Sequence, residues 1–365
     1  MPEVELRRVR MPLAAPFHTA HGTSDERDVL LVRVDEGWAE CAAPADPTYT
    51  SEYTDGAHRV LRDHLVPRYL ADPDASAQDI STLLADVRGH HMAKAALEGA
   101  VLDAALRAEG RSLASYLGAT RPRVPAGIAI GMTESVGALV EQVEAAVAEG
   151  YGRVKLKVQP GWDVEPVRAV RARFADLDLQ VDGNGSYRLD GEGRAEALEA
   201  LDQFDLLLIE QPLPPDDLLG SAAVARRLRT PVCLDESITS PAAARAALAL
   251  GACSVLNVKP GRVGGLLTAK RIHDEGVAAG VPMWVGGMSE TGIGRAALLA
   301  LAALPGFNMT GDLSASARWF DHDITPPFAL DEGMLAVPDG PGIGVDVLLD
   351  ALDACTTSVE RLGQA

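Results

Sequence analysis

Cysteine and histidine are scarce in this sequence, and their spacing excludes several common kinds of site. The four cysteines include no CxxC pair, so neither a zinc site nor a disulfide framework is indicated. The eight histidines show none of the HxH, HExxH or HxxxH spacings of a metal site. Cys233 and Cys253 lie in apolar runs, and we expect both to be buried thiols.

Basic residues and long apolar runs are also in short supply. The chain has 33 Lys and Arg against 52 Asp and Glu, and the formal net charge of −19 repels nucleic acid phosphates and anionic membrane surfaces. No uninterrupted apolar run approaches membrane-spanning length, and the start MPEVELRRVR lacks the apolar core of a secretory signal. We therefore expect no nucleic-acid partner, no membrane partner and a cytoplasmic location.

The first part of the chain predicts an α+β module. Residues 3–10 and 29–35 alternate in hydrophobicity like strands, and the loop-like segment PLAAPFHTAHGTSDER (12–27) separates them. A second loop, APADPTYTSEY (43–53), follows. Helical patterns then appear near residues 54–71, 78–88 and 92–109. Two such long loops are more than a compact domain needs, and long ordered loops are often functional.

From about residue 124, short apolar runs alternate with amphipathic helical patterns. The eight runs are GIAIGM, RVKLKV, LDLQVDGN, FDLLLIEQP, PVCLDES, CSVLNVKPG, VPMWVGGM and GFNMTGD. Eight βα repeats predict a closed parallel α/β barrel. A doubly wound sheet is the alternative, but the chain lacks its glycine-rich phosphate motif, and the GxG at Gly292 and Gly294 is weak evidence. The tail ITPPFALDEGMLAVPDGPGIGV predicts short strands and turns that return to the first module.

The pentapeptide VKLKV (154–158) places two lysines in an apolar strand. Alternation turns Lys155 and Lys157 to one face and the apolar residues to the other. An edge strand protected by lysines would give the same pattern. The second strand of a closed barrel has no free edge, however, so in a barrel both lysines point inward.

Charged residues recur at five consecutive strand ends, where a parallel barrel carries its catalytic groups. The steps between them are 25, 28, 25 and 24 residues. In order they are Lys157, Asp182, Glu210, Asp235 and Lys259. Three clustered carboxylates repel one another unless protons or a cation intervene, and oxygen-only ligands suit Mg²⁺. We therefore assign the three acids as metal ligands. Asn184 and Glu236 could orient them or cap the next helix.

The lysines on strands two and six are expected to lie across the barrel from each other. Burial and nearby positive charge can keep a lysine amine neutral, so that it serves as a base. One lysine could remove the proton α to a substrate carboxylate and leave an enediolate, whose charge a metal stabilises. The other could return a proton from the opposite face, or remain a cation while a β-leaving group departs.

The KxK of VKLKV, the DGN at 182–184, IEQP, LDES and KPGRVGG resemble the muconate-lactonizing subgroup of the enolase superfamily. A Lys or His base with Mg²⁺ is general in that superfamily. The mandelate racemase branch would show a His at the end of strand seven, and VPMWVGGM has none. The whole chain resembles the o-succinylbenzoate synthase and N-acylamino acid (N-succinylamino acid) racemase family. The matching stretches are VELRRVRMPLAAPF, SEYTDGAHRVLRDHL, YGRVKLKVQPGWDVEPVR, DLLLIEQPL, CLDESI, VKPGRVGG, GGMSETGIGRAA and VPDGPGIGV.

The resemblance implies an α/β protein, a modified TIM barrel under an α+β capping domain formed by the N-terminal part and the C-terminal tail. We expect the cap over residues 1–120, the barrel over 121–325, and the returning segment over 326–365. Lys157 and Lys259 would form the acid/base pair, with Lys155 as electrostatic helper. A divalent cation, Mg²⁺ or alternatively Mn²⁺ or Co²⁺, would bind the three acids. A homo-oligomer is also implied.

The resemblance further implies a substrate pocket. Its expected residues are Phe17, Tyr49, Asn184, Arg262, Gly287, Ser289 and Trp319. The three aromatic residues could instead only pack beneath the cap. Arg262 could adjust the nearby lysine, hold a distal carboxylate or simply be solvated. Pro44, Ser289 and Ala129 depart from the residues usual in the family; all three are expected to face the substrate and to affect substrate preference.

The leading hypothesis is therefore a Mg²⁺-dependent enzyme that acts on a small carboxylate. It would dehydrate its substrate to o-succinylbenzoate, a step of menaquinone biosynthesis, racemise N-acylamino or N-succinylamino acids, or do both. Muconate-type cycloisomerisation and dipeptide epimerisation are the enzymatic alternatives. The second would need an additional acidic pair that is not obvious in FNMTGDLSAS. A non-enzymatic, metal-stabilised barrel is the remaining alternative.

Overall fold

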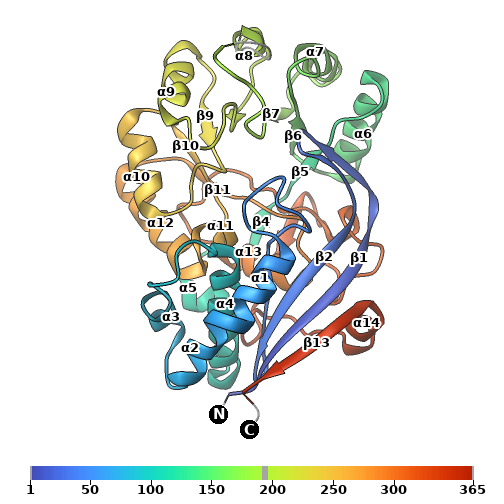
Figure 1. Cartoon of the computed structure of the whole chain (residues 1–365). Coiled ribbons are helices and arrows are strands. Elements are labelled where there is room, and N and C mark those ends of the chain that lie inside the picture. Colours follow the sequence, from blue (N-terminus) through green and yellow to red (C-terminus); the bar gives the residue numbers. More distant parts are fainter. Residues whose placement is uncertain (1, 191–195, 364–365) are drawn as a thin grey trace.

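The computed structural model describes residues 2–190 and 196–363. It has a cap built on an antiparallel sheet and a curved parallel sheet surrounded by helices (Figure 1). The start of β1 and the end of β13 lie side by side at the foot of the cap. The sequence-based fold class is confirmed, because the seven-stranded parallel sheet and the antiparallel sheet at the termini form a modified barrel with a cap.

The cap sheet brings the start and the tail of the chain together. Its strands are β13 (Thr356–Leu362), β1 (Val4–Thr19), β2 (Gly22–Val34) and β3 (Gly37–Cys41), in that order. Val4 pairs with Leu362 on one side and with Val34 on the other. The tail also contacts the cap elsewhere, since Leu113 N donates to Gly342 O at 2.7 Å. The predicted domain boundaries themselves stay a prediction.

Helices cover one face of this sheet. They are α1 (Thr54–Val60), the π-helical turn η1 (Leu61–Leu65), α2 (Val66–Ala71), α3 (Ala77–Leu83), α4 (His91–Glu109) and α5 (Leu113–Leu117). The predicted helices near 54–71 and 92–109 are confirmed, whereas the one expected over 78–88 ends at Leu83. The segment 43–53 contains neither helix nor strand, as expected. It enters the substrate pocket described below.

The prediction of a loop over residues 12–27 is wrong. This segment continues β1 and β2 as a long hairpin that reaches from the cap toward β6 (Figure 1). Its register shifts between Pro12 and Phe17. β13 pairs with β1 only as far as Val9, and beyond it no second strand pairs with β1 in the described chain, so prolines there do not remove a ladder hydrogen bond on that side. The prolines and polar side chains of this segment are typical of loops, which is why the sequence predicted a loop here.

Seven parallel strands form the barrel sheet within the described residues. They are β5 (Gly127–Ile130), β6 (Arg153–Lys157), β7 (Asp178–Asp182), β8 (Ile209–Glu210), β9 (Val232–Leu234), β10 (Val255–Val258) and β11 (Met283–Val285), hydrogen bonded in chain order. The interpretation of VKLKV as an edge strand is wrong, because β6 pairs with both β5 and β7. Val154 and Leu156 are buried on the outer face of the sheet, toward the helices.

The eighth predicted strand, GFNMTGD (306–312), is not a strand. It nevertheless lies between β11 and the start of β5, because Met309 N donates to Met283 O at 3.2 Å and Gly311 forms a parallel bridge with Ala126. Gly311 is closely packed, since a Cβ atom there would clash with Val285 O. This segment closes the barrel without the regular ladder that the apolar run suggested.

Helices surround the barrel between its strands. They are α6 (Val136–Glu149), α7 (Val164–Arg173), α8 (Glu196–Leu201), α9 (Leu218–Arg227), α10 (Pro241–Leu250), α11 (Pro260–Val263), α12 (Leu266–Ala279) and α13 (Gly292–Ala302). Ser135 caps α6 by accepting a hydrogen bond from Ala138 N at 3.1 Å, and Gly150 ends it with a φ of 104°. No helix of the described chain is both long and apolar enough to span a bilayer.

The remaining elements connect the barrel to the cap. They are β4 (Arg123–Pro125), which pairs with β12 (Met334–Ala336), the 3₁₀ turn η2 (Ser316–Arg318) and α14 (Leu349–Cys355). Inside the barrel, a small apolar cluster lies below the strand ends that carry the charged residues. It contains Leu208, Cys233, Val255 and Trp284. Cys233 and Cys253 are buried free thiols, as expected.

Candidate active site

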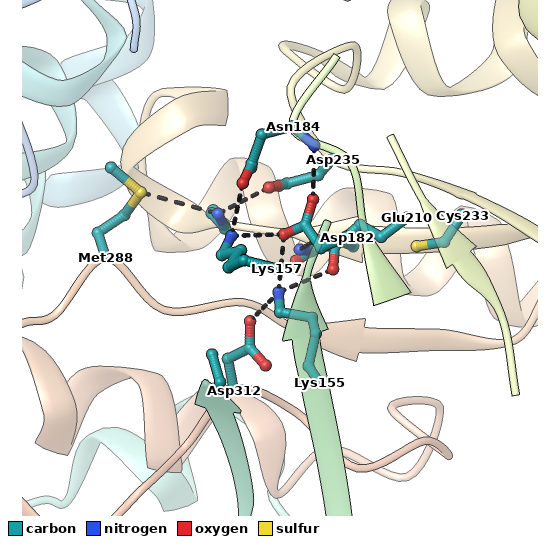
Figure 2. A network of polar contacts seen from close by, with 12 residues as sticks. Lys155, Lys157, Asp182, Asn184, Glu210, Cys233, Asp235, Met288 and Asp312 are labelled. Atoms are coloured by element: carbon teal, nitrogen blue, oxygen red, sulfur yellow. Dashed lines mark hydrogen bonds and ion pairs between the residues drawn. The ribbon is translucent and has the colours of Figure 1, made fainter. Parts of the chain in front are cut away.

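The charged residues predicted at strand ends come together at one end of the barrel. Lys157, Asp182 and Glu210 occupy neighbouring positions in the registers of β6, β7 and β8. Asp235 directly follows β9 and Lys259 directly follows β10. Because the strands are parallel, their carboxyl ends meet at the same edge of the sheet. Figure 2 shows the resulting network.

Lys157 contacts the first acid of the network. Its Nζ donates to Oδ2 of Asp182 at 2.6 Å and to Oδ1 of Asn184 at 2.8 Å (Figure 2). Asn184 adopts a φ of 43° and donates its side-chain amide to Oε1 of Glu236 at 2.8 Å. Neither Asn184 nor Glu236 caps a helix, since the described helices begin later in the chain. The two side chains are instead hydrogen bonded to each other, and the backbone N of Asn184 donates to Oδ1 of Asp182 at 2.9 Å.

Lys259 contacts the third acid from the other side. Its Nζ donates to Oδ2 of Asp235 at 2.8 Å and lies 3.7 Å from Sδ of Met288. Arg262 in α11 also donates to Asp235. The hydroxyl of Tyr49, from the cap, accepts a hydrogen bond from Nη2 of Arg262 at 2.5 Å. A lysine thus lies on each side of the acidic group, on strands that three others separate.

Lys155 lies beneath these groups and is almost completely buried, with 1% of its surface exposed. Its Nζ donates to Oε2 of Glu210 at 2.7 Å and also contacts Asp312 (Figure 2). Burial opposes the charged form, but Asp312 and Glu210 raise the pKa of Lys155 well above its usual value. Lys155 is therefore a permanent cation, which also lies 5.0 Å from the ring of Trp284.

The sequence analysis missed two residues of this network. Asp312 contacts Lys155 and accepts a hydrogen bond from Arg153 at 2.7 Å. Asn257 donates its amide to Oε1 of Glu210 at 2.7 Å. Asp312 had a sequence signal, because it ends the eighth apolar run as the other acids end theirs. Asn257 lies inside a strand, two residues before Lys259, and had none that we could recognise.

The acids differ in their protonation equilibria. Burial, followed by the charge of Asp182, raises the pKa of Glu210 to about 8. Burial also works to raise the pKa values of Asp182 and Asp235, but the adjacent cations lower both below the usual range. Burial and the two aspartates raise the pKa of Glu236. The cations of the group therefore do not offset the cost of burying Glu210 and Glu236 in their charged forms.

These residues fit a hard divalent cation by their chemistry. The three assigned acids offer only oxygen donors, and Oε2 of Glu236 is buried without any hydrogen-bond donor. Within residues 2–190 and 196–363, however, no three acidic, histidine or cysteine side chains surround a common point. The lysine and arginine groups hold the carboxylates instead. A bound cation would have to replace some of these ion pairs.

A cavity of about 200 Å³ lies between the cap and this network. Of the expected substrate-pocket residues, its wall contains Phe17, Tyr49, Asn184, Gly287 and Ser289. Lys157, Lys259 and Pro44 also line it.

Three residues expected at the substrate do not line this cavity. Trp319 packs edge-to-face against Phe17, with ring centroids 5.1 Å apart, and so supports the wall from behind. Arg262 is buried, with 7% exposed, and its guanidinium is committed to Asp235 and Tyr49. Ala129 lies outside the wall, where its carbonyl oxygen accepts a hydrogen bond from Arg318.

Known proteins share this architecture along the whole chain. Residues 1–118 match the mandelate racemase / muconate lactonizing enzyme N-terminal domain, and residues 138–351 match the enolase C-terminal domain-like family. An N-succinylamino acid racemase of Amycolatopsis sp is 54% identical, over 99% of this chain and 98% of the relative. An o-succinylbenzoate synthase of Geobacillus stearothermophilus is 44% identical, over 94% and 92%.

Solved structures agree with the sequence comparison. The crystal structure of an enolase superfamily member from Listeria innocua superposes with a TM-score of 0.93 at 37% identity, and the match covers 99% of this chain and 98% of that one. The matches include the capping and the barrel part together. This chain therefore belongs to the mandelate racemase / muconate lactonizing enzyme family of the enolase superfamily.

Proposed function

We propose that this enzyme removes the proton α to the carboxylate of a small substrate. The observation that carries the proposal is the position of two lysines on either side of one acidic group. Lys157 contacts Asp182 at 2.6 Å, and Lys259 contacts Asp235 at 2.8 Å. Both lysines line the same cavity, so a substrate bound there would meet an amine from each side.

The two lysines would share the proton transfers. In racemisation, one removes the α-proton from one face of the substrate and the other returns a proton to the opposite face. In dehydration, one lysine removes the α-proton and returns it to the β-hydroxyl, which departs as water, while the other lysine remains a cation beside the enediolate. Lys155 does not line the cavity, and its charge would stabilise the carboxylates of the acidic group.

Asp182, Glu210 and Asp235 would hold the divalent cation, for which we propose Mg²⁺ with Mn²⁺ and Co²⁺ as alternatives. When bound, it supplies positive charge next to the substrate carboxylate and so favours loss of the α-proton. Three acids with oxygen donors meet at this place, and burial raises the pKa of Glu210 to about 8; both observations support a cation here.

The relatives support two reactions, racemisation of N-succinylamino acids and formation of o-succinylbenzoate, and we propose that this chain performs one or both. Both begin with the same proton abstraction. Dipeptide epimerisation is disfavoured, because the acid of FNMTGDLSAS, Asp312, is committed to Lys155 and Arg153. Muconate-type cycloisomerisation has no specific observation in its favour. A homo-oligomer and a cytoplasmic location stay predictions.

Hydrogen–deuterium exchange tests the proposal directly. The protein is incubated with Mg²⁺ and N-succinyl-L-phenylalanine in deuterated water, and NMR follows the α-position. We expect deuterium to replace the α-proton and the D enantiomer to appear. A panel of N-acylamino acids and the dehydration substrate of o-succinylbenzoate synthase would be measured beside it. Absence of exchange and of dehydration with every substrate would contradict the proposal.

Lysine variants test the assigned roles. Replacing Lys157 or Lys259 with Ala should abolish turnover, because each removes one of the two proton carriers. Lys270→Ala is the matched control, since Lys270 is a surface residue of α12 that pairs with Asp274 at 2.7 Å. If K157A or K259A kept both metal binding and activity, the assigned roles would be wrong.

A further inference from the structure

An arginine in the wall of the substrate cavity has free hydrogen-bond donors. Arg27 lies on β2 with only 8% of its surface exposed, and it lines the cavity that Lys157 and Lys259 also line. Its Nε and Nη2 atoms are buried and have no acceptor in the protein. Leaving a buried guanidinium without acceptors is costly, so such groups are usually paired. We therefore ask whether a bound ligand supplies the acceptor that Arg27 lacks.

The acids that line the same cavity are already compensated. Asp28 is held by Arg8, whose Nε donates at 2.6 Å, and Glu26 lies 3.4 Å from Nε of Arg10. Asp46, in the second cap loop, accepts hydrogen bonds from its neighbour Thr48. These three carboxylates therefore do not provide the partner that Arg27 lacks.

Glu40 is an acid of the cap whose pKa the charge of Arg27 lowers. It does not serve as a full counter-ion, because its Oε2 accepts two hydrogen bonds from Thr291, at 2.9 and 2.7 Å. Its side chain as a whole is only partly buried, but Oε1 is fully buried and has no donor. Burial and Glu290 raise the pKa of Glu40 to about 8, although Arg27 and Thr291 oppose the rise. At neutral pH Glu40 is thus mostly uncharged.

Two other basic side chains near the cavity already have partners. Arg262, which the sequence suggested for a distal carboxylate, is bound to Asp235 and Tyr49. The ring of His21 contacts the backbone oxygen of Asn184 at 3.2 Å. Arg27 differs from both because its buried Nε and Nη2 have no acceptor in the protein.

We propose that Arg27 binds a second carboxylate of the substrate, the distal one of a succinyl group. A substrate whose reacting carboxylate lies at the barrel acids would extend its other end toward the cap, where Arg27 lies. A guanidinium offers two parallel N–H groups that match a carboxylate. This inference depends on the proposed function, and it makes Arg27 a residue that determines the preferred acyl group.

The test compares two substrates that differ only in the distal carboxylate. N-succinyl-L-phenylalanine and N-butanoyl-L-phenylalanine have acyl chains of equal length, and the second ends in a methyl group. We expect Arg27→Met to lower kcat/KM for the succinyl substrate about 10- to 100-fold, mainly through KM, as expected for a lost hydrogen bond to a charged group. The butanoyl substrate should change less than about threefold. Arg27→Lys should lose less kcat/KM than Arg27→Met, because lysine keeps the positive charge but lacks the two parallel N–H groups of a guanidinium.

Arg10→Met is the matched control, since Arg10 pairs with Glu26 on the same hairpin but does not line the cavity. It should leave both substrates unchanged. Equal losses for the two substrates in Arg27→Met, or no loss for either, would overturn the inference. If Arg27→Met does not fold, the same comparison in Arg27→Lys decides: a loss confined to the succinyl substrate supports the inference, and any other result overturns it.

Binding separates this inference from the proposed function. If the wild-type protein turns over neither substrate, the proposed function fails, and calorimetry with the same two compounds then tests Arg27 alone. Tighter binding of the succinyl compound, lost in Arg27→Met or, where that does not fold, in Arg27→Lys, supports the inference. Equal affinity of the wild-type protein for both compounds overturns it.

Discussion

The hydroxyl of Tyr49 lies 2.5 Å from Nη2 of Arg262 and 3.4 Å from Nζ of Lys259. Tyr49 comes from a cap loop, whereas Arg262 and Lys259 belong to the barrel. A side chain of the cap therefore reaches the lysine that we assign as a base. The cap does more than cover the site, because it contributes an oxygen to the hydrogen bonds around that lysine.

Tyr49→Phe removes this oxygen but keeps the ring, which packs against His21 with centroids 5.4 Å apart. We expect kcat/KM for N-succinyl-L-phenylalanine to fall at least about tenfold, because Arg262 loses a buried acceptor. Tyr116→Phe is the control, since its hydroxyl contacts Gln78 on the cap surface. A value within twofold of wild type for Tyr49→Phe would show that the hydroxyl is dispensable.

Lys155→Met tests the buried cation. It leaves Asp182, Glu210 and Asp312 without their shared ammonium group. Removing one partner of a buried ion pair typically costs about 3–5 kcal/mol, so urea unfolding of the metal-free protein should show a loss of this size. Lys270→Met, which breaks an exposed pair, should cost less than about 0.5 kcal/mol. Similar losses in the two variants would contradict the role of Lys155.

Metal removal tests the acidic group. Dialysis against EDTA should abolish α-proton exchange, and Mg²⁺ should restore it. Because the cation binds the folded protein, Mg²⁺ at 100 times its Kd should stabilise it by about 2.7 kcal/mol, which a thermal melt detects. Asp182→Asn should abolish this increase in Tm. An identical increase in wild type and D182N would show that the cation binds elsewhere.

Gly37→Ala tests the contact between β3 and α4. A Cβ atom on Gly37 would clash with the backbone of Ala100 and Ala104, which cannot move without displacing the helix. We expect the free energy of unfolding to fall by about 1–3 kcal/mol or more. Gly152→Ala is the matched control, because a Cβ there meets open space and its φ is negative or extended. Equal unfolding midpoints for the two variants would contradict the close packing.

Glu40→Gln tests the pH dependence of stability. The pKa of Glu40 is about 8 in the folded chain against 4.5 in the unfolded one, so the folded state holds the proton more tightly. This contribution to stability is complete below pH 4.5 and is lost as the pH rises through 8, by at most about 1.4 kcal/mol per pH unit. Glu40→Gln should therefore gain stability relative to wild type between pH 5 and 8.5. Parallel curves in urea unfolding would exclude this titration.

The sequence predicted the acids and lysines of the site because strand length and repeat spacing are regular. Each of these residues ends an apolar run, and parallel strands place such ends at one edge. Asp312 ends the eighth run in the same way, but it was not assigned because the seventh run, VPMWVGGM, carries no charge and interrupts the series. The lysine partners could not be predicted either. Which carboxylate a flexible lysine contacts depends on side-chain conformations that the spacing does not fix.

The cap was harder to predict than the barrel. Its hairpin extension has exposed, polar and proline-containing strands, which lack the alternation that identifies strands. Trp319 was expected in the substrate pocket, but it packs behind Phe17. Such distinctions depend on contacts between segments about 300 residues apart in the chain, and local patterns contain no information about them.

The place of β13 next to β1 affects how the protein can fold during synthesis. β13 follows every barrel strand in the chain, yet it completes a sheet that begins at Val4. Until β13 has left the ribosome, one edge of β1 has no partner, and unpaired strand edges can associate with other chains. The edge of β1 in the nascent cap therefore stays unpaired while the whole barrel is translated. Slow translation of the segment that precedes β13 would prolong this exposed state.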